Sequence, residues 1–211
     1  MNPETQLVRG LAALGVALAP KEIQKLLDYL VLLAKWNRVY NLTAVRDESK
    51  MVSHHLLDSL AVLPHISARR LLDVGSGGGL PGIPLAIARS DMRVTLLDSN
   101  HKKCAFLKQA AIELELGNVE VACERVEDFH APEKFDVIIS RAFADLGEFI
   151  SGSCHLLAPN GTFVAMKGVH PHEEIGHLPP GYALKSVAKL DVPGLQAQRH
   201  LVLAGASAPA S

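Results

Sequence analysis

The stretch Asp73-Val-Gly-Ser-Gly-Gly-Gly-Leu-Pro-Gly82 decides the fold, because it follows directly on the short apolar run Arg70–Val74. Five of the chain's 16 glycines fall within eight residues of this stretch. Glycine tolerates positive φ and lets a backbone approach a ligand closely. A plain tight turn needs only one or two glycines, so we expect a ligand-binding loop at the carboxyl end of a strand, where open α/β sheets bind their ligands.

Strand and helix patterns alternate around this loop. Short apolar runs typical of buried strands are Arg70–Val74, Val94–Leu97, Val119–Ala122, Phe135–Ile139 and Thr162–Met166, and the helical patterns between them are Asn100–Leu116 and Asp145–Leu157. Such alternation predicts a parallel sheet covered on both faces. Two later strand candidates, Leu184–Val192 and His200–Leu203, have no room for a crossover helix between them, so we expect them to be antiparallel. The prediction is an α/β fold with a seven-stranded, mostly parallel sheet.

The residues before the sheet predict a helical extension. Apolar side chains recur at helical spacing from Lys21 onward, and Asp47 suits the N-cap of a further helix that Pro64 ends. We expect residues 1–66 to form an extension packed on the core, residues 67–204 to form the main domain, and residues 205–211 to be a disordered tail. We interpret Leu11–Ala19 as a core-facing helix and not as a processing signal, because Glu4 offsets Arg9.

The composition excludes several classes of protein. The chain has 211 residues, 48% of them hydrophobic, and a net charge of −1, which argues against a disordered or polybasic protein. No apolar run approaches the ~18 residues of a membrane span. Cys104, Cys123 and Cys154 lack a Cys-x-x-Cys pair, so we expect neither a disulfide framework nor a zinc site, and a reducing, cytoplasmic location. The histidine pairs have no firm ligand spacing, so we predict no metal site.

The glycine loop matches two ligand patterns. Gly77, Gly79 and Gly82 satisfy G-x-G-x-x-G, but this match begins three residues past the strand. The pattern acid-x-Gly-x-Gly-x-Gly, from Asp73 through Gly75, Gly77 and Gly79, fits in register and is typical of Rossmann-like class I methyltransferases that bind S-adenosylmethionine. Asp98 ends the second predicted strand, where a carboxylate can accept hydrogen bonds from both ribose hydroxyls. We therefore expect this fold and this cofactor.

Two cations stand where predicted strands end. Arg141 and Lys167 are candidate catalytic residues at this edge, and Lys167, Arg199 and His200 are candidates for binding substrate. The fourth strand ends in Ser140-Arg141-Ala142, without the Asn/Asp-Pro-Pro-Tyr/Phe of amine methylation, and no cysteine follows a proline as in C5-pyrimidine enzymes. An acceptor with a ring lone pair, such as guanine N7, needs neither a base nor a covalent nucleophile.

Several motifs together resemble one family. They are Trp36-Asn37, Tyr40-Asn-Leu-Thr43, His55 with Leu57-Asp-Ser59, the loop Asp73–Gly82, Leu97-Asp-Ser99, Phe135-Asp136, Ser140-Arg-Ala142, Lys167-Gly168 and Arg199-His200. The chain resembles the bacterial 16S rRNA (guanine-N7) methyltransferase family, also called glucose-inhibited division protein B, from about residue 20 to 204. The resemblance implies methyl transfer to N7 of a guanine in a decoding-region loop of 16S rRNA.

The resemblance also implies site residues and partners. The implied cofactor contacts are Gly75, Leu80, Val126, Glu127 and Arg141. The implied partner is 16S rRNA, within the small ribosomal subunit or an assembly intermediate, and we expect no membrane and no obligate protein partner. No third of the chain is strongly basic, so we predict a small phosphate footprint and a shallow salt dependence of RNA binding.

Two alternatives stay open at this point. One is an S-adenosylmethionine-dependent methyltransferase that acts on a small molecule or a protein, with the same cofactor site and a different acceptor. The other is a nucleotide-binding regulator or a nicotinamide enzyme that uses the later G-x-G-x-x-G register.

Overall fold

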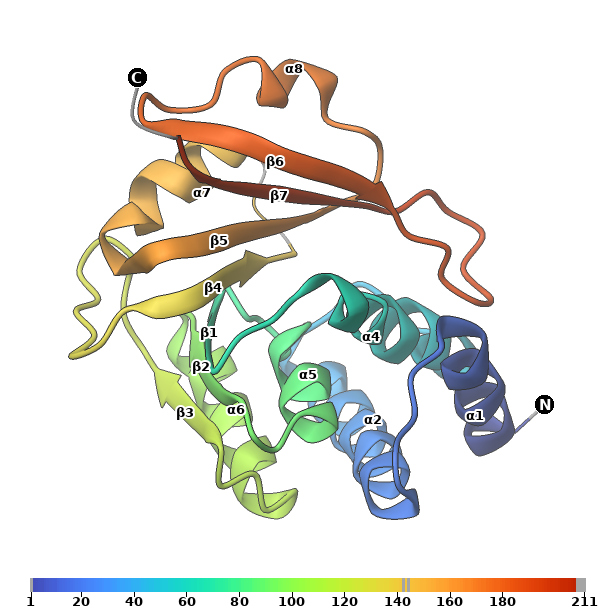
Figure 1. The fold of residues 1–211 in the computed structure, drawn as a ribbon. Helices are drawn as coiled ribbons and strands as arrows, with labels where there is room; N and C mark the ends of the chain where they lie inside the picture. Colours follow the sequence, from blue (N-terminus) through green and yellow to red (C-terminus); the bar gives the residue numbers. More distant parts are fainter. Residues whose placement is uncertain (1, 142, 144, 208–211) are drawn as a thin grey trace.

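A computed structural model describes residues 2–141, 143 and 145–207 and contains one seven-stranded sheet (Figure 1). The strands are β1 (Arg70–Val74), β2 (Arg93–Leu97), β3 (Val119–Ala122), β4 (Phe135–Ser140), β5 (Leu157–Lys167), β6 (Tyr182–Lys189) and β7 (His200–Ala206). Their order is β3-β2-β1-β4-β5-β7-β6. The first five strands pair in parallel, and β7 is antiparallel to both β5 and β6. The predicted α/β fold with an antiparallel end is confirmed.

Helices cover both faces of the sheet. They are α1 (Pro3–Leu14), α2 (Pro20–Tyr40), α3 (Glu48–Met51), a π-helical segment η1 (Val52–Leu57), α4 (Asp58–Leu60), η2 (Leu63–His65), α5 (Gly82–Ala88), α6 (His101–Glu113), α7 (Leu146–Ser153), η3 (Cys154–Leu156) and α8 (His172–Ile175). Successive residues of a strand point to opposite faces. Leu71 accordingly joins the core under α2, α5 and α6, whereas Leu72 joins the core under α7.

The N-terminal helices lie beside α5 and α6 on one side of the sheet (Figure 1). Leu7 of α1, Leu33 of α2 and Leu57 of η1 are buried in the same core as residues of β1 and β2. Gly10 faces the Leu57 side chain so closely that a Cβ would overlap it, which brings α1 onto η1. The extension therefore shares its core with the sheet domain.

The structure differs from the sequence expectations at the end of α1 and at the start of the predicted tail. Helix α1 ends at Leu14 because Gly15 adopts φ 67°, so residues 16–19 do not continue the expected helix. Gly205 and Ala206 belong to β7, where they pair with Ala183 and Tyr182, which corrects the start of the predicted tail at residue 205. Residues 208–211 of that tail and Ala142 lie outside the described residues.

The predicted N-cap at Asp47 is confirmed, and Asp145 caps α7 in the same way. Asp47 accepts a hydrogen bond from the Ser49 amide at 3.0 Å, and Asp145 accepts one from the Glu148 amide at 2.9 Å. Among the helices of the described residues, none is long and apolar enough to cross a bilayer.

Candidate functional site

The glycine loop is fastened at both ends by short hydrogen bonds. The Asp73 carboxylate accepts from the Gly82 amide at 2.9 Å, and the Ser76 hydroxyl donates to the Asp73 carbonyl at 2.8 Å. The Gly75 amide donates to the carbonyl of Leu97, the last residue of β2, at 2.8 Å. The loop is thus held against the carboxyl ends of β1 and β2, where ligands of open α/β sheets bind.

Two glycines of the loop serve different purposes. Gly75 adopts φ 69°, and open space lies where its Cβ would stand, so the backbone itself forms the wall of a cavity. Gly79 adopts φ 84°, and its Cβ would overlap the side chains of Ile83 and Leu107. Gly75 therefore leaves room for a ligand, whereas Gly79 lets the loop turn against α5 and α6.

Asp98 links the loop to the end of β2. One oxygen of its buried carboxylate accepts from the Gly77 amide and the other from the Asn100 amide, both at 2.9 Å. The ammonium of Lys103 lies 3.8 Å from the first oxygen. Each carboxylate oxygen has two lone pairs, so Asp98 holds the loop and still has acceptor capacity for a ligand.

A cavity of about 320 Å³ opens beside these groups. It is lined by Val74, Gly75, Leu97, Asp98, Ser99, Lys103, Glu124, Arg125, Val126, Glu127 and Phe143. Apolar side chains and carboxylates share the lining, which suits a ligand with an aromatic base and a diol. The volume falls within the roughly 300–1,000 Å³ typical of ligand pockets.

The structure divides the predicted cofactor residues into two groups. Gly75, Asp98, Val126 and Glu127 line the cavity. Asp73, Gly77, Gly79 and Leu80 shape the loop, and Arg141 lies outside the lining. Lys103, Arg125 and Phe143 line the cavity without having been singled out, because their types and spacing carry no motif signal.

Two cysteines pair next to this cavity, which corrects the expectation of free thiols. A disulfide joins Cys104, in the first turn of α6, to Cys123, which follows β3. Their Cα atoms are 5.9 Å apart, because β2 and β3 are neighbours and α6 begins directly beyond β2. Cys154 is a free thiol. Sequence spacing did not predict the pair, since only the sheet order brings the two residues together.

The predicted cations do gather at the carboxyl edge of the sheet, but they are not free surface charges. Lys167 pairs with His200 across β5 and β7, and its ammonium donates to Glu174 at 2.7 Å and to the Phe143 carbonyl at 3.1 Å. His200 is buried, and its Nδ1 donates to the Gly168 carbonyl at 3.1 Å. Lys167 and His200 therefore hold the segments that follow β4 and β5 in place at this edge.

The two arginines at this edge meet one buried carboxylate. Arg141, directly after β4, lies 3.4 Å from one oxygen of Asp58, and Arg199, directly before β7, donates to the other oxygen at 2.8 Å. Arg141 also donates to the His54 carbonyl at 3.2 Å. Each arginine side chain remains about a quarter exposed, with values of 25% and 24%. Sequence reasoning missed Asp58 as a site residue, although it stands in the Leu57-Asp-Ser59 motif.

Buried titratable groups stand behind the loop. Burial raises the pKa of Asp73 to about 7, opposed by its hydrogen bond from Gly82 and by the charge of Arg141. Burial and the charge of Arg141 lower the pKa of His55 to about 4, so the ring is neutral at pH 7. Burial also raises the pKa of Tyr29, whose hydroxyl donates to the Gly78 carbonyl at 2.6 Å. The positive charge of Arg141 thus influences the pKa of Asp73, which fastens the glycine loop.

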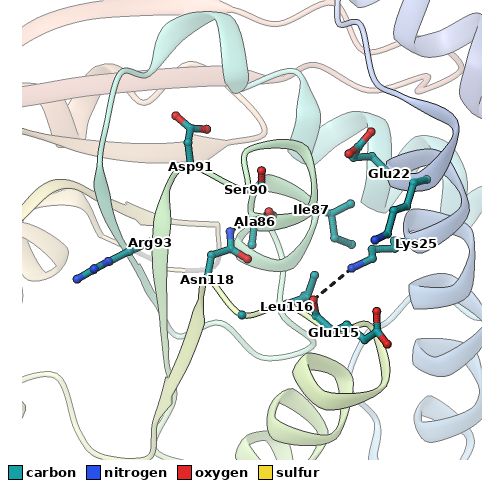
Figure 2. Close-up of a pocket in the computed structure, with 12 residues that line it drawn as sticks. Glu22, Lys25, Ala86, Ile87, Ser90, Asp91, Arg93, Glu115, Leu116 and Asn118 are labelled. Carbon is teal, nitrogen blue, oxygen red and sulfur yellow. Dashed lines mark hydrogen bonds between the residues drawn. The ribbon is translucent and has the colours of Figure 1, made fainter.

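A second cavity, of about 560 Å³, lies at the opposite edge of the sheet (Figure 2). Lys25 of α2 donates there to the Glu115 carbonyl at 3.2 Å, and the Asn118 amide donates to the Ala86 and Met92 carbonyls at 3.0 and 2.9 Å. Arg93 and Asn118 stand at the amino ends of β2 and β3. This cavity is therefore not the crevice in which such sheets bind ligands.

The strand order and the glycine-lined cavity define a Rossmann-like class I methyltransferase, a class that uses S-adenosylmethionine as methyl donor. The fold is similar to the O-methyltransferase TomG from Streptomyces achromogenes, solved with S-adenosylmethionine (TM-score 0.60, 20% identity, 99% of this chain and 100% of that one). It is also similar to a methyltransferase from Aquifex aeolicus (TM-score 0.59, 18% identity, 82% and 97% covered).

Sequence comparison narrows the class to one family. The family described as "GidB: rRNA small subunit methyltransferase G" matches residues 22–202. The chain is 58% identical to ribosomal RNA small subunit methyltransferase G of Laribacter hongkongensis, over 97% of this chain and 99% of that one. It is 53% identical to the protein of the same name in Neisseria meningitidis serogroup B, over 96% and 98%. The chain belongs to this family of methyltransferases, which confirms the resemblance.

Proposed function

We propose that the protein transfers a methyl group from S-adenosylmethionine to N7 of a guanine in the decoding region of 16S rRNA, within the small ribosomal subunit or an assembly intermediate. The observation that carries the proposal is the cavity behind Gly75, which opens at the edge where Arg141 and Arg199 gather. Family membership supplies the ribosomal substrate class.

The residues of the cavity fit the cofactor. Gly75 leaves open space where a side chain would stand, and Asp98 offers a carboxylate with spare lone pairs for the ribose hydroxyls. Val126 and Glu127, in the turn after β3, would hold the adenine edge. When bound, the cofactor supplies an electrophilic methyl group on a sulfonium.

The protein's part in the reaction is positioning, which can supply several kcal/mol in a displacement of this kind. The loop is fastened to β1 and β2, so it would hold a bound cofactor in a fixed place relative to the edge that carries the cations. Arg141 has N–H groups to hold the cofactor carboxylate or a substrate oxygen. Lys167 donates to the Phe143 carbonyl and to the Glu174 carboxylate. Its proposed contribution to catalysis is to hold Phe143, close to Arg141, in place.

The proposal of N7 as acceptor rests on proton balance. A guanine N7 lone pair would take the methyl group of the bound cofactor, which would leave as the neutral thioether, and the base would gain a positive charge without losing a proton. No general base is required. His55, which is neutral and buried, and Asp73, which holds the loop, are therefore free to serve structural purposes.

The test is methylation of small ribosomal subunits from a strain that lacks the gene. Purified protein with methyl-labelled S-adenosylmethionine should label 16S rRNA, and nuclease digestion should yield N7-methylguanosine. Subunits from the parent strain, already modified, should take up little label. A labelled small molecule or protein with unlabelled rRNA would instead favour the alternative acceptor class.

Asp98→Asn serves as a site control in this assay, because it alters the cofactor cavity and leaves the cationic edge intact. It should lower turnover at limiting cofactor and recover part of the activity at high cofactor concentration.

A further inference from the structure

Asp58 is a buried carboxylate that lies in the N-terminal extension and not in the sheet domain. It begins α4 and its side chain is 1% exposed. A carboxylate in such a place is strongly destabilising unless a cation and hydrogen bonds compensate it. Its partners therefore indicate why the chain keeps a charge there.

Those partners are the two arginines of the substrate edge, one on each oxygen. Arg141 follows β4 and Arg199 precedes β7, and β5 lies between these two strands in the sheet. Neighbouring strands in a sheet are about 4.8 Å apart, so β4 and β7 lie roughly 10 Å apart, and Asp58 joins the arginine that follows one of them to the arginine that precedes the other. One carboxylate thus sets the spacing of two guanidinium groups that no strand pairing would fix.

The same contacts leave donors available on both arginines. Arg141 uses Nη1 for Asp58 and for the His54 carbonyl, and Arg199 uses Nε for Asp58 and Nη1 for the Gln198 carbonyl. Within residues 2–141, 143 and 145–207, Nη2 of each arginine makes no protein hydrogen bond. Guanidinium groups with free N–H edges match phosphate and base oxygens.

The net charge of Asp58, Arg141 and Arg199 is small, as is the net charge of the whole chain. Two arginines and one aspartate leave a single net positive charge at the edge, in a protein whose net charge is −1. A small, rigid cationic site gains its selectivity from geometry, because fixed donors lose less conformational entropy on binding than free surface side chains do.

We propose that Asp58 is a positioning residue of the substrate face, which holds Arg141 and Arg199 as one preorganised pair of guanidinium groups for the rRNA. This inference rests on the proposed function. Asp58 makes no contact with substrate itself, and it acts through the two arginines.

The test measures steady-state kinetics on small ribosomal subunits for Asp58→Asn, Arg199→Gln and the double variant, below the unfolding temperature of each. Asp58→Asn should lower kcat/KM by roughly 10- to 100-fold, mainly through KM, because the guanidinium groups lose their common anchor. The double variant should be little worse than the worse single variant. The affinity for adenosine, which lacks the carboxylate that Arg141 can hold, should stay within about threefold of the wild-type value, since the cavity lining contains neither Asp58 nor Arg141.

Asp136→Asn is the matched control for a merely structural carboxylate. Asp136 accepts the amides of Arg69 and Arg70 at the opposite edge of the sheet, at 2.8 and 2.9 Å. It should lower the melting temperature and leave KM unchanged. If Asp58→Asn also lowers only the melting temperature, or if its effect and that of Arg199→Gln multiply independently, Asp58 is not a positioning residue.

Failure of the proposed function looks different. Wild-type protein would then leave unmodified subunits unmethylated, whereas failure of the inference alone leaves an active wild type and an Asp58→Asn variant with unchanged KM.

Discussion

Asp98→Asn is the sharpest probe of the cofactor cavity. The aspartate accepts two amide hydrogen bonds, from Gly77 and Asn100, with separate oxygens. Asparagine has one acceptor oxygen, so its NH2 group must face one of the two amides. The variant loses at least one hydrogen bond to a charged group, worth about 1.5–3 kcal/mol, and the lost bond loosens either the loop or the start of α6.

The assay is calorimetric titration with S-adenosylhomocysteine. If the loss falls on the bound state, 1.5–3 kcal/mol corresponds to an affinity roughly 10- to 150-fold weaker. Asp91→Asn is the control, because Asp91 lies near the other end of β2, where its exposed carboxylate pairs with Arg89. A surface pair of this kind contributes about 0–1 kcal/mol and should not alter binding.

An affinity of Asp98→Asn within about threefold of the wild-type value, with an unchanged melting temperature, would refute the reasoning. It would mean that Asp98 neither fixes the loop nor meets the cofactor. A lower melting temperature with unchanged affinity would restrict its role to the loop.

Three further outcomes are expected. Gly79→Ala should lower the free energy of unfolding by about 2 kcal/mol or more in urea titrations, because φ 84° and the crowded Cβ position both oppose a side chain; equal stability would contradict the loop geometry. The buried His55 has a pKa of about 4, so between pH 7 and pH 4.5 it is protonated in the unfolded state and stays neutral in the folded state. The wild type should therefore lose about 2 kcal/mol more stability over this range than His55→Gln does. Parallel curves of stability against pH for the two proteins would count against the burial of His55. Reduction of the Cys104–Cys123 disulfide should lower the free energy of unfolding of the wild type by about 3 kcal/mol. The same treatment should leave the stability of Cys104→Ser unchanged and should affect Cys154→Ser as it affects the wild type, because Cys154 is a free thiol.

Local patterns predicted the sheet and the loop well. β1 and β3 have the predicted bounds, and β2 and β4 differ by one residue at one end. β1, β2 and β4 are buried on both faces, so their sequences are short apolar runs with clear limits. The glycine cluster predicted the loop equally well, because few residues tolerate the positive φ that its turn requires.

Long-range contacts set the limits of prediction. The pairing of Asp58 with Arg141 and Arg199 spans 83 and 141 positions, and nothing in the spacing of the three residues announces it. The π-helical segment η1 was not predicted either. An apolar pattern of helical spacing does not distinguish the backbone hydrogen bonds of an α-helix, which join residues four apart, from those of a π-helix, which join residues five apart. Lys167 was predicted to be a catalytic residue, but its partner Glu174 was not predicted, because it belongs to a short helix that the sequence did not suggest. Its catalytic role stays a prediction.

The hydroxyl of Tyr29, which donates to the Gly78 carbonyl from α2, makes the helical extension a working part of the catalytic domain. A shortened protein that began at residue 67 would present the rear of the glycine loop and the apolar backs of α5 and α6 to water. Anyone who transplants this methyltransferase unit into another enzyme must therefore carry the first helices along, or redesign the bare surface that they leave.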